Sequence, residues 1–385
     1  NVDKETAYID KAWLNSIDNP ELYNNNVYGT IELSEYRNPG NIIYRSNSAA
    51  PKLAVFSEVY YKTWKAYIDG EVEEIPLAER EAIGNVIDYA SGRNRYIGYL
   101  ISLASNSYKR LQIGIDTANG ASWSIAKAVF EALGAQLHVT GGEPNGTNIN
   151  TDCGSTHIEG LQKFVVDNGL DVGFAFDGDA DRFLAIDENG NEVDGDKLIS
   201  IFAKHMKSKN KLKNNTAVVT VMSNMGFFKF CEENGIVCEK TKVGDRYVLE
   251  NMLANGHSIG GEQSGHLIFL DHATTGDGQL SALKLLFIMK EKGKKLSELT
   301  CEMQTFPQIL VNVPVSDFGK AKFSYDQEIK NAIYRIEQEL GDDGRVLVRV
   351  SGTEPLLRVM FEGKNEEKIK VLCKELVDVI KERLI

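Results

Sequence analysis

The chain has 385 residues, a mass of 42.8 kDa and a formal net charge of −12 at pH 7. This length exceeds what one hydrophobic core usually serves, so we expect two to four domains. The negative charge argues against a general nucleic-acid or anionic-membrane binder, although a local basic pocket can still hold a small anion. No stretch reaches the roughly 18 consecutive apolar residues of a membrane helix. Five scattered cysteines without a CxxC pair are typical of a reduced, cytoplasmic protein.

Residues 1–65 are rich in asparagine and show little periodicity, and helices are expected over 56–68 and 88–105. From about Leu111 onward, short apolar runs alternate with amphipathic stretches. Strands are expected over 111–116, 135–142, 171–177, 216–222, 236–241 and 266–270, and helices over 123–135, 156–170, 197–209, 225–235, 246–256 and 278–293. This alternation predicts parallel sheets in α/β layers.

The pattern changes after about Gln304. A strand over 308–315, a helix over 327–341, a β-hairpin formed by 344–351 and 354–363, and a closing helix over 366–385 predict a smaller α+β unit.

The sequence FDGDADR places Asp177, Asp179 and Asp181 at alternate positions after an apolar strand, with Arg182 directly behind. Carboxylates at this spacing can converge on one hard divalent cation, and ligands of α/β sheets bind at the carboxyl ends of parallel strands. An EF-hand does not fit, because a strand precedes the cluster and Arg182 stands where that loop needs glycine. A plain acidic turn would not need apolar residues on both sides. The motif therefore indicates a Mg²⁺ and phosphate site, with Arg182 as a fixed cation.

Two further turns carry polar side chains that suit a sugar phosphate. In RVSGTEPLLR, backbone N–H groups of a Ser-Gly-Thr turn can bind an anion, and the alternative is an ordinary hairpin turn; its candidate residues are Arg349, Ser351, Gly352, Thr353 and Arg358. In GGEQSGH, alternation lets Glu262, Ser264 and His266 face one way if the segment is extended. Its alternative is a glycine-rich turn with a structural histidine. Sugar hydroxyls suit the acceptors and donors, and a histidine can move protons near neutral pH.

The loops DTANGAS (116–122), TKVGDRY (241–247) and TTGDG (274–278) are weak signals individually. Five glycine-bearing loops lying between strands and helices are nevertheless better explained by shared ligand contact than by chance.

In order and spacing, IDTANGA, TDCGSTH, FDGDADR, VDGD, TVMSNMGF, TKVGDRYV, GGEQSGH, TTGDGQLSAL and RVSGTEPLLRVM resemble the motifs of the α-D-phosphohexomutases, over roughly four-fifths of the chain. GEQSGH favours the glucosamine branch of that family over the phosphomannomutase/phosphoglucomutase branch. The resemblance implies three α/β domains and a smaller α+β domain. On this basis we expect an incomplete or divergent first domain over 1–104, a second with the metal loop over 105–195, a third with the sugar loop over 196–305, and a C-terminal phosphate-binding domain over 306–385.

The resemblance also implies a reaction, the interconversion of glucosamine 6-phosphate and glucosamine 1-phosphate through a phosphoserine and a bisphosphate intermediate, serving amino-sugar metabolism and cell-wall precursor synthesis. It implies Mg²⁺ on Asp177, Asp179 and Asp181, with Arg182 steadying the transferring group and His266 as a candidate for proton transfer. The implied substrate-binding residues are Gly244, Asp245, Arg246, Glu262, Ser264, Arg349, Ser351, Gly352, Thr353 and Arg358. A homodimer is the family expectation, and no nucleic-acid or membrane partner is expected.

The family's nucleophilic serine, in a loop close to SASHNP, is not identified in this sequence. Ser46 and Ser48 in YRSNSAAP precede a proline but lack the His-Asn-Pro context. Either the first domain is incomplete or altered, or the chain is a natural variant that binds sugar phosphates without turnover; the intact remaining motifs favour the first. The alternatives for the whole chain are a phosphomannomutase/phosphoglucomutase and a non-catalytic sugar-phosphate-binding protein.

Overall fold

The computed structural model describes residues 30–38, 41–47, 66–68, 71–73, 90–104, 107–351 and 354–384, the first four segments by their backbone alone. The chain divides into two compact units, Asn1–Ile87 and Asp88–Ile385.

In the first unit, two antiparallel pairs are described. These are β1 (Thr30–Asn38) with β2 (Asn41–Asn47), and β3 (Ala66–Ile68) with β4 (Glu71–Glu73). The helix expected over 56–68 is wrong at residues 66–68, which form β3, and its other residues lie outside the described part of the chain. The Asp-Gly pair between β3 and β4 is a strong sequence signal for a hairpin and explains this outcome.

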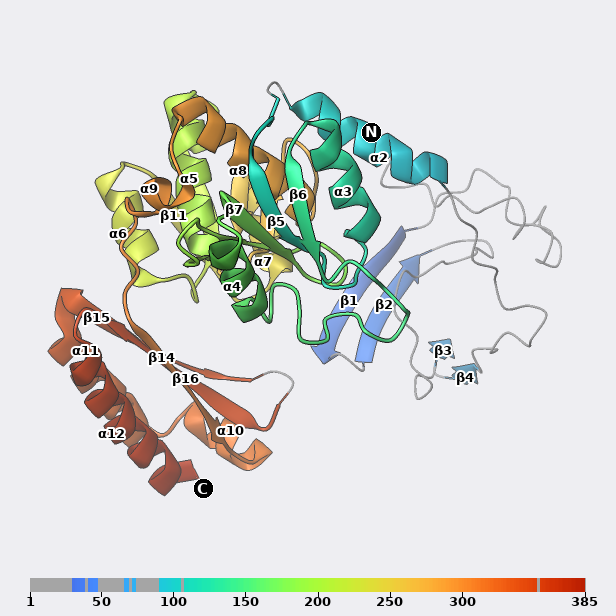
Figure 1. The fold of residues 1–385 in the computed structure, drawn as a ribbon. Helices are drawn as coiled ribbons and strands as arrows, with labels where there is room; N and C mark the ends of the chain where they lie inside the picture. Colours follow the sequence, from blue (N-terminus) through green and yellow to red (C-terminus); the bar gives the residue numbers. More distant parts are fainter. Residues whose placement is uncertain are drawn as a thin grey trace. The chain divides into compact units, whose positions relative to one another are not determined.

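The second unit contains a five-stranded sheet in the order β6-β5-β7-β8-β9. Figure 1 labels β5, β6 and β7 of this sheet. Its strands are β5 (Gln112–Asp116), β6 (Gln136–Thr140), β7 (Val172–Phe176), β8 (Phe183–Ile186) and β9 (Glu192–Val193). β5, β6 and β7 are parallel as expected, whereas β8 and β9 are antiparallel. The reason for the difference is the short connection 177–182, since a parallel crossover needs roughly a dozen residues or more.

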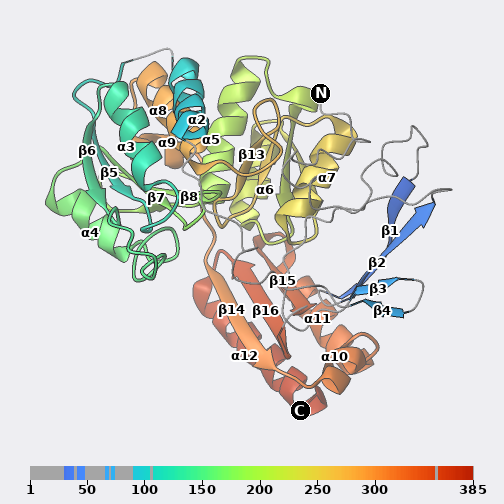
Figure 2. The same ribbon diagram turned by 90° about the vertical axis from the view of Figure 1, so that its right-hand side faces the viewer.

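Three helices lie in the region of the five-stranded sheet. They are α2 (Ala90–Leu103), α3 (Trp123–Ala132) and α4 (Glu159–Asp167). α3 and α4 pack on the strands of this sheet, and α2 packs on α3 (Figure 2). The helices expected over 88–105, 123–135 and 156–170 are therefore confirmed, each shorter by a few residues at its ends.

A four-stranded sheet follows, in the order β11-β10-β12-β13. Its strands are β10 (Thr216–Thr220), β11 (Val237–Thr241), β12 (Ile259–Gly261) and β13 (Leu267–Phe269). β12 and β13 form an antiparallel hairpin, again because a short loop joins them. The accompanying helices are α5 (Gly195–Ser208), η2 (Lys213–Asn215), α6 (Met225–Glu233), α7 (Asp245–Asn255), α8 (Gly278–Lys292) and α9 (Leu296–Thr300).

The last part of the chain forms a three-stranded antiparallel sheet in the order β14-β16-β15. Its elements are β14 (Gln308–Pro314), α10 (Asp317–Phe323), α11 (Gln327–Leu340), η3 (Gly341–Asp343), β15 (Gly344–Val350), β16 (Leu356–Gly363) and α12 (Glu366–Leu384). The predicted hairpin of β15 and β16 is confirmed. α11 and α12 pack against this sheet (Figure 1).

One large apolar core is shared by the five-stranded and four-stranded sheets, and the three-stranded sheet has a separate core. Phe174, Phe176 and Phe183 belong to the large core and are fully buried, with Phe174 and Phe183 ring centroids 5.3 Å apart. These aromatic side chains flank the three aspartates on both sides and fix the ends of their loop. Among the described residues, no helix combines the length and apolarity that a bilayer crossing requires.

Candidate functional site

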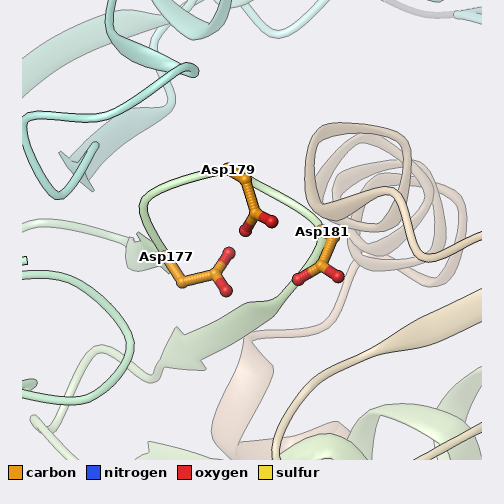
Figure 3. Close-up of side chains that lie close together, drawn as sticks. All are labelled: Asp177, Asp179 and Asp181. Atoms are coloured by element: carbon orange, nitrogen blue, oxygen red, sulfur yellow. The ribbon is translucent and has the colours of Figure 1, made fainter. Parts of the chain in front are cut away.

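The three aspartates lie in the hairpin loop between β7 and β8, at the carboxyl end of β7. Asp177, Asp179 and Asp181 each offer one carboxylate oxygen, and these oxygens lie within 4.8 Å of one another (Figure 3). The Asp177 side chain is largely buried and Asp179 is exposed. This arrangement matches the predicted convergence of the three carboxylates.

Electrostatics make this cluster costly without a cation. Burial, opposed by the amide hydrogen bond from Arg182 and reinforced by repulsion from Asp181 and Asp179, raises the pKa of Asp177 to about 6. The Arg182 amide lies 3.1 Å from Asp177 Oδ1, and its guanidinium Nε lies 3.8 Å from Asp177 and 3.9 Å from Asp181. An all-carboxylate donor set of this kind fits a hard divalent cation such as Mg²⁺.

Two glycine-bearing loops pack on the aspartate loop. Ala121 N donates to Gly178 O at 2.8 Å, and a Cβ at Gly120 would come within 2.2 Å of the same oxygen. From the other loop, Gly278 N donates to Ala180 O at 3.0 Å. The DTANGAS and TTGDG segments, weak as sequence signals, thus support the aspartate loop through their backbones.

The sugar-loop candidates lie in the hairpin between β12 and β13. The segment turns tightly rather than extending, because Gly265 N donates to Glu262 O at 3.0 Å and Gly265 has a φ of 95°. Glu262 Oε1 accepts a hydrogen bond from Gly244 N at 3.1 Å, so this loop contacts the predicted 241–247 loop. Ser264 is exposed and His266 is buried.

His266 joins the sugar loop to the aspartate loop. Its Nδ1 lies 3.1 Å from Asp181 Oδ2, and its Nε2 accepts a hydrogen bond from Gly276 N at 3.0 Å. An isolated antiparallel bridge between Arg182 and His266 brings the two backbones together. The sequence motifs pointed to each loop separately, and only the fold shows that His266 contacts an aspartate.

The remaining candidates of the 241–247 loop stand at the start of α7. Gly244 precedes the helix with a φ of 129°, a conformation that favours glycine. Asp245 Oδ2 lies 4.0 Å from His266 Nε2, and Arg246 forms an ion pair of 2.7 Å with Glu250. Asp245 therefore joins the group around His266, which the sequence did not indicate.

The phosphate-loop candidates lie where β15 and β16 meet. Arg349 and Arg358 are paired across the two strands, and burial together with repulsion from Arg358 lowers the pKa of the Arg349 guanidinium. The Nε atoms of both are buried without a hydrogen-bond partner. The Ser351 carbonyl accepts a hydrogen bond from Lys320 Nζ at 3.2 Å, a cation that the sequence motif did not include. Gly352 and Thr353 lie outside the described residues.

Three regions of the chain match domains of the phosphoglucomutase/phosphomannomutase family. Residues 94–190 match alpha/beta/alpha domain II, residues 194–306 match alpha/beta/alpha domain III, and residues 310–379 match the C-terminal domain. The matched regions follow the three sheets of the second unit.

Curated relatives and solved structures agree with this assignment. The chain is 53% identical over 317 residues to a phosphoglucosamine mutase of Lachnoclostridium phytofermentans, covering 82% of this chain and 70% of the relative. It is 49% identical over 357 residues to that of Lachnospira eligens, covering 92% and 78%.

Solved structures share the fold at lower identity. A phosphoglucomutase/phosphomannomutase family protein of Burkholderia thailandensis superposes with a TM-score of 0.65 at 21% identity, over 76% of this chain and 65% of that one. The N-acetylphosphoglucosamine mutase of Aspergillus fumigatus, solved in complex with GlcNAc-6P and magnesium, gives 0.62 at 18% identity, over 76% and 65%. The chain thus spans just under two thirds of the length of these solved relatives. The two curated relatives named above are phosphoglucosamine mutases, and the chain belongs to the phosphoglucomutase/phosphomannomutase family of the α-D-phosphohexomutases, a family of isomerases.

Proposed function

We propose that this protein interconverts glucosamine 6-phosphate and glucosamine 1-phosphate. The observation that carries the proposal is the contact between the aspartate loop and the sugar loop through His266 and the Arg182 bridge. It supports the proposal because the carboxylates that would hold a cation lie next to side chains that would bind sugar hydroxyls. The relatives of about 50% identity, which are phosphoglucosamine mutases, support the choice of glucosamine.

Group transfer in this proposal conserves the phosphate. A phosphoserine gives its phosphoryl group to the free hydroxyl of the sugar phosphate and takes up the hydroxyl proton. The resulting bisphosphate reorients, its other phosphoryl group returns to the serine oxygen, and the serine hydroxyl proton passes to the sugar oxygen that is released. The nucleophilic serine is not identified: Ser46 lies in β2, where only the backbone is described, and Ser48 lies outside the described residues.

The side chains divide this work by their chemistry. Asp177, Asp179 and Asp181 would hold the divalent cation, which when bound neutralises charge on a transferring phosphoryl group. The Arg182 guanidinium, next to these carboxylates, would bind the same group.

Substrate binding falls to three groups of residues. Glu262 and exposed Ser264 would hold sugar hydroxyls. The start of α7, which Glu262 contacts through Gly244 N, would bind the substrate beside them. The phosphate that is not reacting would be held at the end of the β15–β16 hairpin, where Arg349 and Arg358 occupy paired positions on the two strands. The residues in these groups are Glu262, Ser264, Gly244, Asp245, Arg246, Arg349, Ser351, Gly352, Thr353 and Arg358. We also propose a homodimer, as in the family that the chain resembles. The five scattered cysteines favour a cytoplasmic location.

The test is turnover of glucosamine 6-phosphate by this chain with Mg²⁺ and glucosamine 1,6-bisphosphate as primer. We expect glucosamine 1-phosphate to form, and to form faster than products from mannose 1-phosphate or glucose 1-phosphate. A preference for mannose 1-phosphate would favour a phosphomannomutase/phosphoglucomutase instead. Binding of glucosamine 6-phosphate without any turnover would favour a non-catalytic sugar-phosphate-binding protein.

A further inference from the structure

We propose that Tyr96 on α2 is a positioning residue for the aspartate loop: its hydroxyl anchors Asp277, and the amide next to Asp277 holds the left-handed turn at Ala180. This inference rests on the proposed function, because the loop it concerns is the one that would hold the cation. It extends the candidate site to a helix that carries none of the site residues predicted from the sequence.

The aspartate loop contains one strained backbone position. Ala180, between Asp179 and Asp181, has a φ of 64°, in the left-handed region that an alanine side chain disfavours. The turn reverses the chain inside the short β7–β8 connection, where the three carboxylate oxygens lie within 4.8 Å of one another. A relaxed Ala180 would redirect the chain between the aspartates and separate them. Such a conformation persists only where surrounding structure holds it.

The loop before α8 supplies contacts that hold this turn. Gly278 N donates to Ala180 O at 3.0 Å. A Cβ at Gly276 would lie 2.4 Å from Asp181 O, so only glycine lets the two backbones come this close. Gly278 is the first residue of α8, and the first amides of a helix have no partner within it. The position of the Gly278 amide is therefore set by whatever fixes the start of α8.

Asp277 fixes the start of α8, and Tyr96 fixes Asp277. Asp277 is the N-cap residue of α8, and its Oδ1 accepts a hydrogen bond from Leu280 N at 2.9 Å. The same oxygen accepts a hydrogen bond from the Tyr96 hydroxyl at 2.7 Å. Burial, reinforced by the Asp277 carboxylate, raises the pKa of Tyr96, so the hydroxyl remains a neutral donor. A hydrogen bond to an ionised acceptor is stronger than one between neutral groups.

α2 is a firm support for this contact. It packs against α3 and α8 (Figure 2). Tyr96 itself is partly buried against the large apolar core, and Leu100, one turn further along, is fully buried. A close-packed side chain has few alternative rotamers, so its hydroxyl keeps a fixed position. The Tyr96 hydroxyl therefore restrains Asp277 and does not merely follow it.

Three substitutions isolate this role. Tyr96→Phe removes the hydroxyl and keeps the ring. Tyr99→Phe is a matched control, because Tyr99 lies one turn away on α2 and its hydroxyl contacts His272 Nδ1 at 2.8 Å, not Asp277. Ala180→Gly removes the strain, since glycine adopts a positive φ without steric cost. If Tyr96 acts through the turn at Ala180, loss of its hydroxyl must matter less when Ala180→Gly is already present.

The first measurement needs no metal. It is hydrogen–deuterium exchange of the metal-free full chain, with melting curves to verify that each variant folds. We expect the amides of Ala180, Arg182 and Gly278 to exchange about tenfold faster in Tyr96→Phe, and to exchange as in the wild-type protein in Tyr99→Phe. Unchanged exchange in Tyr96→Phe, or an equal rise in both variants, would overturn the inference.

The second measurement is the dissociation constant of Mn²⁺, a paramagnetic substitute for Mg²⁺, by electron paramagnetic resonance. Residues that orient metal-binding groups change affinity about 10- to 100-fold, and Tyr96 acts further from the carboxylates, so we expect Tyr96→Phe to raise the constant about fivefold. Tyr99→Phe should change it less than about twofold. Adding Tyr96→Phe to Ala180→Gly should also change it less than about twofold.

The outcomes separate this inference from the proposed function. An equal loss of Mn²⁺ affinity from Tyr96→Phe with and without Ala180→Gly would overturn the route through Ala180, and with it the inference. Absence of Mn²⁺ binding by the wild-type chain would overturn the proposed function. Faster exchange in Tyr96→Phe alone would in that case still support the positioning of the loop by Tyr96.

Discussion

Replacing Glu362 by glutamine is expected to loosen the contact between the C-terminal domain and the preceding α/β domain. Glu362 lies on β16, is fully buried, and forms an ion pair of 2.6 Å with Arg345 on β15. Its carboxylate also accepts hydrogen bonds from three residues outside that hairpin, Asn224, Met225 and Gln308. Arg345 in turn donates to the carbonyls of Val221 and Ser223. Both partners of this ion pair therefore form hydrogen bonds to the preceding domain, Glu362 to Asn224 and Met225 and Arg345 to Val221 and Ser223.

The structure sets the size of the effect. Removing one partner of a buried ion pair typically costs about 3–5 kcal/mol, because the other charge is left without compensation. In Glu362→Gln, one carboxylate oxygen becomes an N–H₂ group that faces donors. A cost of about 3 kcal/mol corresponds to a rise of more than 100-fold in the equilibrium constant for separating the two domains. Each domain keeps its own apolar core, so we expect local opening and not complete unfolding.

Hydrogen–deuterium exchange measures this opening directly. Amides of residues 221–226 and 304–308 should exchange about 100-fold faster in Glu362→Gln, while amides within β15 and β16 keep their protection. The control is Glu375→Gln, which breaks an exposed Arg335–Glu375 ion pair in the same domain and should leave exchange at 221–226 and 304–308 as in the wild-type protein. Exchange at 221–226 and 304–308 that matches the wild-type protein would refute the reasoning.

Two other substitutions test like-charge clusters. Burial, reinforced by repulsion from Asp194, raises the pKa of Asp196 to about 7 from an ordinary value of 3.8. The folded state therefore binds more protons than the unfolded state between these values, so stability falls as pH rises through that window. Asp196→Asn should make the melting temperature less dependent on pH between pH 5 and pH 8. A variant whose melting temperature falls with pH as steeply as that of the wild-type protein would contradict this. Arg349→Met should relieve repulsion from Arg358 by about 0.5 kcal/mol. Inorganic phosphate should raise the melting temperature of the wild-type protein, and Arg349→Met should abolish that rise; a rise retained in the variant would contradict the phosphate assignment.

Local sequence patterns were sufficient to predict most elements and the aspartate loop. The apolar run before the aspartates predicted a buried strand, and the apolar residues on both sides argued against a plain acidic surface turn. β8 was not among the predicted strands, and its antiparallel direction follows from the short loop 177–182 that joins it to β7. Polar alternation suggested one common face for Glu262, Ser264 and His266, but the turn at Gly265 gives Glu262 and His266 different neighbours.

Contacts between distant residues could not be predicted in the same way. His266 and Asp181 are separated by 85 positions, and Glu362 and Asn224 by 138. Glu362 stands at the end of an apolar strand, where a charged residue usually indicates solvent. Only the packing of the two domains shows that this carboxylate is buried and paired.

Two opposite like-charge clusters characterise the chain, and together they restrict its ligands. Three carboxylates converge after β7, and two arginines, Arg349 and Arg358, occupy paired positions on β15 and β16. Each arrangement costs free energy in the empty protein, since burial, reinforced by like-charge repulsion, raises the pKa of Asp177 and lowers that of Arg349. The rigid cores beneath them supply the free energy that keeps each cluster together. A ligand of opposite charge relieves the repulsion and stabilises the folded state in proportion to its binding. By charge, one cluster would favour a cation and the other an anion, which are the two ligands that the proposed reaction on a sugar phosphate uses.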